Sequence, residues 1–347
     1  MIHLQSLNHL SKRKKTKVLI DMLRNGISNE AYHSDPALGR SVADRLLTSC
    51  PAKVKYDMEN PQPSTPALLI GSMVHSATLE PDKLDMEFGC KPAEIDGNSS
   101  RTNAYKEAFA RMQDENPGKK WLSPSDYNMC LEIAASAREH PLMQELLYHE
   151  DTKIEHTGFF ELEGASCKVR PDLFNASSSG IITDLKTTQD ASPRGFAKSV
   201  RQFGYAFQAA WYMTALRVMG EKPKKFVFLV VEKSAPFVTA CYTLNQSDID
   251  REIPRVHEAC KLWAKCVKED VWPGYSDDIT TLNLGTLYNQ NRLSVTKIAE
   301  HFGVSRSYVY TILQKYKLEM RKVGNKQTIG VAEFNNALRW MNEGDAV

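Results

Sequence analysis

Arg170-Pro171-Asp172 is followed, after a turn, by the apolar stretch IITDLKTT at residues 181–188. Side chains alternate between the two faces of a strand, so Asp184 and Lys186 point the same way, with Leu185 packed behind them. An apolar strand does not normally end in an aspartate and a lysine one residue apart. Bringing Asp172 alongside places two carboxylates and one ammonium in a single pocket at the edge of a sheet.

This combination of side chains has a defined chemistry. Carboxylates are the ligands that Mg²⁺ prefers, and a bound metal beside a lysine can position a water to attack a phosphodiester. The pattern therefore predicts a metal-dependent nuclease. The competing interpretation is a surface aspartate with a strand-end salt bridge, which an isolated Asp-x-Lys would favour.

Chain length limits the number of domains, and the charge distribution indicates where nucleic acid could bind. A chain of 347 residues can hold one large domain with a sizeable core and a small appendage. The formal net charge of +2 is nearly neutral, so affinity for nucleic acid must come from the distribution of charge. That distribution is uneven, because residues 1–30 and 286–326 are both strongly basic.

Cysteine usage and hydropathy favour a cytoplasmic protein. The seven cysteines are scattered without a CxxC pair, and their odd number does not suggest a disulfide framework. We therefore expect reduced thiols. No apolar run has the length of a transmembrane helix, and the basic N-terminus lacks the apolar stretch of a secretory signal.

The periodicity of apolar residues predicts an α/β fold. Strand-like runs occur at 154–162, 166–174, 181–188, 226–232 and 237–244, and the first two are joined by a hairpin at Glu163-Gly164. Long helical patterns cover 194–219 and 247–268. We expect a central mixed sheet flanked by helices, with the acidic residues at its edge.

A second pattern begins near residue 286. It fits a helix-turn-helix, with small and apolar residues at Ile298, Ala299, Phe302, Gly303, Val304, Val309 and Ile312. Ser305 would cap the second helix. The exposed face of that helix would offer four DNA-binding residues: Arg306, Ser307, Tyr308 and Tyr310. The pattern predicts a small all-α domain.

Several motifs occur in a fixed order along the chain: GISNEAYH at 26–33, GSMVH at 71–75, LEP at 79–81, RPD at 170–172, DLKTT at 184–188 and Gln208-x-x-x-Tyr212. Together they resemble the nuclease domain of the exonuclease VIII (RecE) family. That family lies within the PD-(D/E)xK superfamily, which also includes bacteriophage lambda exonuclease. The resemblance implies a restriction-endonuclease-like core. It places a nuclease domain at 26–284, after a basic arm at 1–25. The helix-turn-helix domain at 285–347 departs from the family pattern.

The resemblance assigns roles to the central residues. Asp172 and Asp184 would bind the catalytic metal, with the Leu185 carbonyl as a third protein oxygen. Lys186 would orient or deprotonate the attacking water, and a lowered pKa would suit that task.

A third acidic ligand is implied on the strand before the hairpin. Glu155 matches the family spacing better than Glu161 or Glu163, which lie at the hairpin end. A solvated strand glutamate is the alternative interpretation of Glu155.

Four further residues are implied in the site. His75 would contact the metal or a phosphate, although a lone histidine on an apolar helix is more often structural. Gln208 and Tyr212 share one helix face and would contact DNA near the scissile phosphate, unless they are a solvated glutamine and a core tyrosine. Arg170 would hold a phosphate or neutralise the acidic cluster.

The implied activity is exonucleolytic. Relatives use a pair of Mg²⁺ or Mn²⁺ ions, digest linear duplex DNA 5′ to 3′ and leave 3′ single strands for an annealing recombinase. They act as a ring tetramer in the cytoplasm of a bacterial host, often encoded by a phage. Two alternatives stay open: an endonuclease guided to a sequence by the helix-turn-helix, and a non-catalytic DNA-binding regulator. The intact acidic residues and Lys186 argue against the regulator.

Overall fold

The computed structural model describes residues 23–61, 65–92, 102–176, 179–276, 278, 292–323, 326–330, 334 and 337. The chain divides into two compact units, Met1–Tyr275 and Ser276–Val347, and each is described by itself. Most of the basic arm predicted at 1–25 lies outside the described residues. So does most of the segment around the predicted 284/285 boundary, which stays a prediction.

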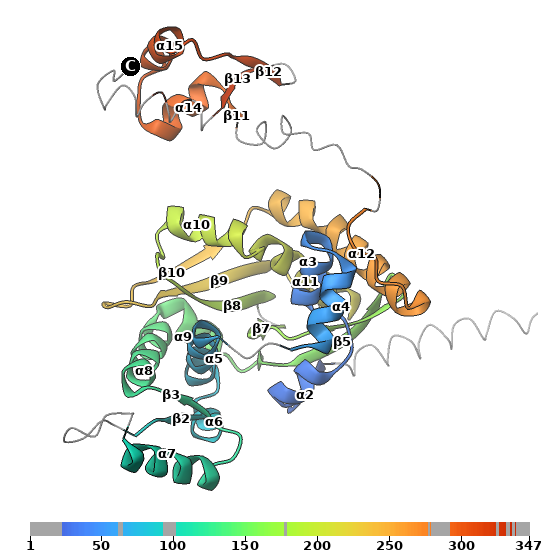
Figure 1. The fold of residues 1–347 in the computed structure, drawn as a ribbon, viewed down its shortest axis with the longest axis vertical. Helices are drawn as coiled ribbons and strands as arrows, with labels where there is room; N and C mark the ends of the chain where they lie inside the picture. Colours follow the sequence, from blue (N-terminus) through green and yellow to red (C-terminus); the bar gives the residue numbers. More distant parts are fainter. Residues whose placement is uncertain are drawn as a thin grey trace, which may run out of the picture. The chain divides into compact units, whose positions relative to one another are not determined.

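A five-stranded sheet forms the centre of the large unit (Figure 1). Its strands, in spatial order, are β10 (Thr239–Thr243), β9 (Lys225–Glu232), β8 (Ile181–Thr188), β7 (Leu173–Asn175) and β4 (Thr152–Ile154). Strands β8 and β9 are parallel and the other neighbours are antiparallel. The predicted mixed sheet is confirmed.

Two predicted strands are each split in the structure. The run at 154–162 divides into β4 and β5 (Thr157–Leu162), and the run at 166–174 divides into β6 (Ala165–Val169) and β7. Strands β5 and β6 form a second sheet with β1 (Leu23–Arg24). Glu155, with a φ of 50°, and Pro171 interrupt the two runs. A hydrogen bond joins the two interruptions, because Glu155 N–H donates to the Asp172 carbonyl at 3.0 Å.

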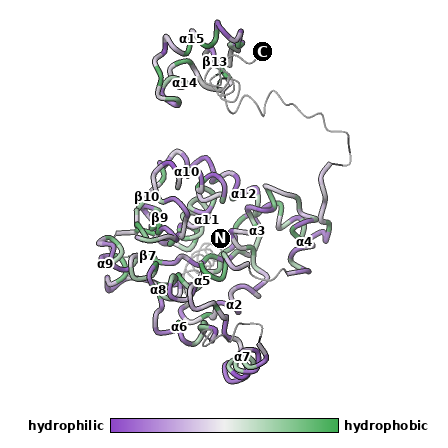
Figure 2. Tube along the Cα trace, turned by 60° about the vertical axis from the view of Figure 1, so that its left-hand side comes forward, coloured by the Kyte–Doolittle hydropathy of each residue, from purple (hydrophilic) through white to green (hydrophobic). Residues whose placement is uncertain are grey.

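Helices cover both faces of the central sheet (Figure 1). One face carries α3 (Arg40–Thr48), α10 (Pro193–Gln202), α11 (Tyr205–Val218) and α12 (Gln246–Glu269), and the other carries α5 (Pro66–Leu79), α8 (Pro124–Glu139) and α9 (Pro141–Leu147). Strand β9 is hydrophobic along almost its whole length (Figure 2). Its side chains alternate between the two cores, with Phe228 in one and Leu229 in the other. Along β8, Ile182 faces the first core and Leu185 the second, as alternation requires.

The helix predicted at 194–219 is two helices, α10 and α11. The break lies at Gly204, whose φ of +63° is in the left-handed region. A Cβ there would lie 2.7 Å from Asp44 Oδ2. Arg40 Nη2 donates to the carbonyls of Phe203 at 2.7 Å and Gly204 at 2.6 Å. These contacts end α10 and turn the start of α11 toward β8.

Smaller elements complete the large unit: α2 (Asn29–Ser34), α4 (Pro51–Glu59), α6 (Pro81–Glu87), β2 (Phe88–Cys90), α7 (Asn103–Glu115) and β3 (Lys120–Leu122). Strands β2 and β3 pair in parallel. Within the described residues, no helix combines the length and apolarity needed to cross a bilayer.

The small unit contains α14 (Val295–Phe302) and α15 (Arg306–Lys315), joined through Gly303 at a φ of +65°. The predicted all-α composition is wrong, because β11 (Arg292–Leu293), β13 (Lys326–Gly330) and β12 (Arg321–Val323) form a three-stranded antiparallel sheet. Ile329 on β13 is fully buried with Ile298 and Ile312. Two short helices have too little apolar surface for a core, and Ile329 of the sheet, with Phe334 and Ala337 after it, adds to theirs.

Candidate active site

Strand β8 places its two charged residues as alternation predicts. Asp184 is only 1 % exposed and lies on the same buried face of β8 as the apolar Ile182. Lys186 Nζ lies 2.5 Å from Asp184 Oδ2. A buried carboxylate is costly unless it is paired, and here Lys186 supplies the opposite charge.

Asp172 joins β8 through the backbone. Its Oδ2 accepts a hydrogen bond from Leu185 N–H at 2.7 Å, which fixes the carboxylate beside the strand. Burial, with the charge of Asp184 adding and that of His75 opposing, raises the pKa of Asp172 to about 7. Crowded carboxylates of this kind favour a cation between them.

His75 reaches this cluster from α5. Its Nε2 lies 2.9 Å from the Leu185 carbonyl oxygen and must donate to it, since a carbonyl only accepts. Its Nδ1 lies 3.5 Å from Asp172 Oδ2 and 3.9 Å from Glu155 Oε1. Burial lowers the pKa of His75, but the two carboxylates outweigh it and raise the pKa to about 9. The imidazole is therefore charged near neutral pH in the metal-free protein.

Of the three glutamates considered on this hairpin, the structure brings Glu155 to the cluster. Its side chain is 24 % exposed and faces His75. Glu161 is exposed, and Glu163 is bound elsewhere, 2.8 Å from His257 Nδ1 on α12. The left-handed backbone at Glu155 turns its side chain into the cavity at the point where β4 passes into β5.

The residues present fit a divalent cation. Ligand atoms of His75, Glu155 and Asp172 all lie within 4.8 Å of one another, and the Asp184 carboxylate lies on the neighbouring strand. Carboxylate and carbonyl oxygens suit Mg²⁺ or Mn²⁺, and a histidine nitrogen is compatible with the latter. His75 would have to release its Nδ1 proton to become a ligand.

Lys186 differs from expectation in its protonation. Burial lowers the pKa of Lys186, but Asp184 and Asp172 raise it above its ordinary value, so the predicted lowering does not hold for the metal-free site. Its Nζ also lies 4.8 Å from the ring centre of Tyr205. Sequence reasoning missed Tyr205, although its i, i+3 spacing from Gln208 was an available signal.

Gln208 and Tyr212 lie behind Asp184 and do not line the cavity. Gln208 Nε2 donates to Asp184 Oδ1 at 2.5 Å and is nearly fully buried. Tyr212 packs against Phe226 with ring centres 5.8 Å apart, and burial, with Asp184, raises its pKa well above the ordinary value. The pair shares a helix face as predicted, and Gln208 orients the Asp184 carboxylate.

Arg170 is engaged by neutral groups. Its Nε donates to Thr157 Oγ1 at 2.8 Å and its Nη2 to the Ile27 carbonyl at 2.9 Å, and its guanidinium lies 4.2 Å from the Tyr32 ring centre. These contacts bind the segment before α2 to the second sheet. The arginine lines the cavity while only 8 % of it is exposed.

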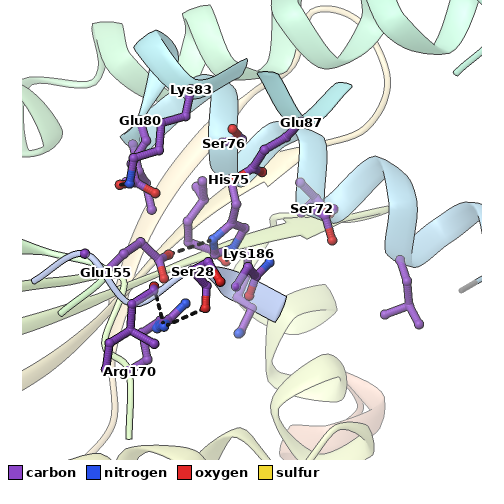
Figure 3. A pocket seen from close by; sticks show the side chains of 18 of the residues that line it. Ser28, Ser72, His75, Ser76, Glu80, Lys83, Glu87, Glu155, Arg170 and Lys186 are labelled. Atoms are coloured by element: carbon purple, nitrogen blue, oxygen red, sulfur yellow. Dashed lines mark hydrogen bonds and ion pairs between the residues drawn. The ribbon is translucent and has the colours of Figure 1, made fainter. Parts of the chain in front are cut away.

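A cavity of about 700 Å³ opens over the cluster. Figure 3 shows His75, Glu155 and Lys186 directed into the same space. The walls come from the segment before α2, from α5 and from α6, and their polar residues include Ser28, Ser72, Ser76, Glu80, Lys83 and Glu87. The space can hold a nucleotide-sized group.

In the small unit, the four predicted DNA-binding residues lie on the first turns of α15. Arg306, Ser307 and Tyr310 are exposed, whereas Tyr308 is half-buried and packs against the core of the unit. Ser305 caps the helix as predicted, because its Oγ accepts from Tyr308 N–H at 3.1 Å.

Comparisons with known proteins agree with this architecture. A family model described as a PDDEXK-like domain of unknown function (DUF3799) matches residues 44–284. A crystal structure of a provisionally assigned exonuclease from Eubacterium rectale is 16 % identical with a TM-score of 0.51, over 76 % of this chain and 98 % of that one. A phage-related exonuclease from Haemophilus somnus 129PT is 16 % identical over 55 % of this chain and 94 % of that one, with a TM-score of 0.28. No curated protein matches the chain. At these identities the first structure bears on the fold alone.

Proposed function

The chain belongs to the family of PDDEXK-like domains, and from this premise we propose that it is a divalent-metal-dependent exonuclease acting on the ends of linear duplex DNA. The observation that carries the proposal is the cluster of His75, Glu155 and Asp172, with Asp184 and Lys186 beside it. His75, Glu155 and Lys186 line one cavity, and Asp172 and Asp184 are buried next to them. A structural ion pair needs no such group of acids, whereas metal-assisted phosphodiester hydrolysis does.

In the proposed site, the carboxylates of Glu155, Asp172 and Asp184, the Leu185 carbonyl and His75 would hold Mg²⁺ or Mn²⁺, as a pair of ions. Such ions, when bound, would supply Lewis-acid polarisation of the phosphate and a water of lowered pKa.

The protein residues supply positioning and charge. Lys186, a cation held by Asp184, donates hydrogen bonds into the cavity, where it orients the attacking water and offsets negative charge on the phosphoryl group. A charged Lys186 fits this orienting role better than that of general base. Asp184 is itself fixed by Gln208, and Asp172 by Leu185 N–H, so both carboxylates are preorganised.

The finer features of the proposed activity rest on the sequence resemblance to the exonuclease VIII family. They are digestion from 5′ to 3′, release of 3′ single strands for an annealing recombinase, a ring tetramer, and action in the cytoplasm of a bacterial or phage-infected cell.

A sequence-guided endonuclease is the second candidate, and one observation favours it. The exposed Arg306, Ser307 and Tyr310 follow a left-handed Gly303 turn, an arrangement suited to placing α15 in a DNA groove. For the exonuclease, the same unit would hold duplex DNA near its end. A non-catalytic regulator would not need the preorganised acids.

Digestion of a 5′-labelled linear duplex beside a closed circular plasmid separates these candidates. With Mg²⁺, the exonuclease releases labelled nucleotides from the linear duplex and leaves the circle intact, and EDTA stops the release. Nicking or linearisation of the circle would establish the endonuclease instead. Binding of both DNAs without cleavage in Mg²⁺ or Mn²⁺ would leave the regulator.

A further inference from the structure

Helix α10 presents a row of cations to solvent. The exposed residues Arg194, Lys198 and Arg201 are spaced i, i+4 and i+7, so they lie along one side of the helix. The opposite side is apolar and carries the buried Gly195 and Phe196. Phe196 anchors the helix on the sheet, with ring centres 5.5 Å from Phe228 and 5.2 Å from Tyr242.

These three cations are free of ion pairs. Helix α10 contains no acidic residue, and no carboxylate in the described part of the chain forms an ion pair with any of them. Lys198 contributes, after hydrogen bonds from Ser192, to a lowered pKa of the exposed Asp190, but the two do not form a salt bridge. The row therefore keeps its positive charge available to a ligand.

Helix α12 provides an internal comparison. Lys261, Lys265 and Lys268 have the same i, i+4, i+7 spacing and are also exposed. Lys261 lies 3.6 Å from Glu163, however, and α12 carries Glu258 and Glu269 among these lysines. The cations of the two helices therefore have the same spacing, but nearby carboxylates offset positive charge on α12 and do not do so on α10.

The described lysines and arginine that line the active-site cavity are each bound to another group of the protein. Lys83 pairs with Glu80, Lys186 with Asp184, and Arg170 with Thr157 and backbone carbonyls. Glu87 and Glu155 add negative charge to the walls. Such a cavity suits metal ions and one phosphate, but the phosphates beyond it need cations from another surface.

Helix α10 leads directly to this cavity. Its C-cap residue is Phe203, whose side chain is 50 % exposed and whose ring centre lies 5.7 Å from that of Tyr205. Tyr205 lines the cavity and covers Lys186. A half-exposed aromatic ring, packed on one side against Tyr205, therefore lies between the row of cations and the catalytic lysine.

We propose that the outer side of α10 binds the phosphate backbone of DNA and that Phe203 stacks on a base at the mouth of the cavity. The inference rests on the proposed action on DNA. The three cations span about 10 Å along the helix, from seven residues at a rise of 1.5 Å, which is enough to contact successive phosphates of one strand. Aromatic stacking is tolerant of sequence, as an exonuclease requires.

The test compares two charge-matched triple variants of the full chain: Arg194→Gln/Lys198→Gln/Arg201→Gln on α10, and Lys261→Gln/Lys265→Gln/Lys268→Gln on α12. Both carry Lys186→Ala, so that cleavage does not interfere. Binding of a fluorescent duplex with a short 3′ overhang is measured by anisotropy over a series of salt concentrations. Each lost phosphate contact should reduce the slope of log K against log [salt] by about 0.9.

The proposal predicts at least a tenfold loss of affinity and a slope smaller by about 2 to 3 for the α10 variant, with little change for the α12 variant. Phe203→Ser should weaken binding without changing the slope, because stacking releases no counterions. Equal losses in the two triple variants, an unchanged slope in the α10 variant, or no DNA binding by the parent protein would overturn it. The Lys186→Ala protein could bind DNA through α10 while the wild type, which keeps Lys186, fails to cleave DNA. That result would refute the proposed nuclease activity and leave the DNA-binding role of α10 intact.

Discussion

The large unit buries charged side chains at its centre, whereas the described part of the small unit buries none. Lys168, Arg170, Asp172 and Asp184 of the large unit are all less than 9 % exposed. The core of the small unit is apolar, and the lysines and arginine whose exposure is described there, Lys297, Arg306, Lys315 and Lys317, lie on its surface. Buried charge opposes folding unless it is compensated. Among the described residues it occurs only in the large unit, so catalysis is expected there and only binding in the small unit.

The largest effect should follow from removing Lys186. Lys186→Ala should lower duplex cleavage by roughly 10²- to 10³-fold, the usual cost of removing one preorganised hydrogen-bond donor that stabilises developing charge. The control is Lys83→Ala, which also lines the cavity but pairs with Glu80. Initial rates under saturating Mg²⁺ measure both. A similar loss of cleavage rate in the two variants would show that Lys186 acts only through the overall charge of the cavity.

In the small unit, the largest expected effect concerns stability. Ile329→Ala should lower its free energy of unfolding by about 2 to 4 kcal/mol, because a buried side chain is replaced by a void. Met320→Ala, at a position 40 % exposed, is the control. Calorimetry should show the loss in one transition, with cleavage of a short linear duplex retained. Loss of cleavage with Ile329→Ala alone would break the distinction between the units.

A smaller effect is expected at the break between α10 and α11. Gly204→Ala places a Cβ 2.7 Å from Asp44 Oδ2 in a left-handed backbone, and should destabilise the large unit by about 1 to 2 kcal/mol. Gly220→Ala has the same left-handed strain, with φ +88° and no atom within 4 Å of the new Cβ. Thermal unfolding should therefore show the larger shift for Gly204→Ala, with reduced cleavage because Tyr205 moves. Equal shifts would mean that the contact with Asp44 is unimportant.

A further prediction concerns the pH dependence of the stability of the metal-free large unit. The folded-state pKa values of Asp172 and His75, about 7 and about 9, are both raised, so the folded state binds more protons than the unfolded state. Stability from these groups is present at acid pH and is lost as pH rises, through about 7 for Asp172 and about 9 for His75. The unfolding temperature in EDTA should fall over this range, and Mg²⁺ should raise it more at pH 8 than at pH 6. A shift with Mg²⁺ that does not depend on pH would count against cation binding at these carboxylates.

The central part of the fold could be predicted because its signals are local. Alternation along 181–188 fixes which side chains share a face, and the order of strands and helices indicates a mixed sheet. The interruptions could not be predicted in this way. The left-handed backbone at Glu155 depends on its contact with Asp172, and the break at Gly204 depends on Arg40, far away in sequence.

The candidate site shows the same division. Asp172, Asp184 and Lys186 follow from one strand and one adjacent motif. Tyr205 entered the site only because the helix breaks before it, and the raised pKa of Lys186 depends on how closely the acids surround it. In the small unit, β13 completes a core that two helices could not form, and this too is a property of packing in space.

The central claim is that the buried acids of the large unit form a metal-dependent nuclease centre. Its most direct test is release of nucleotides from a labelled linear duplex over a range of Mg²⁺ concentrations, for the wild type and for Asp184→Asn, with metal binding measured by calorimetry in parallel. We expect Mg²⁺-dependent release by the wild type, and loss of both metal binding and release in the variant, while binding to DNA persists. Release in EDTA, or unchanged release by Asp184→Asn, would contradict it.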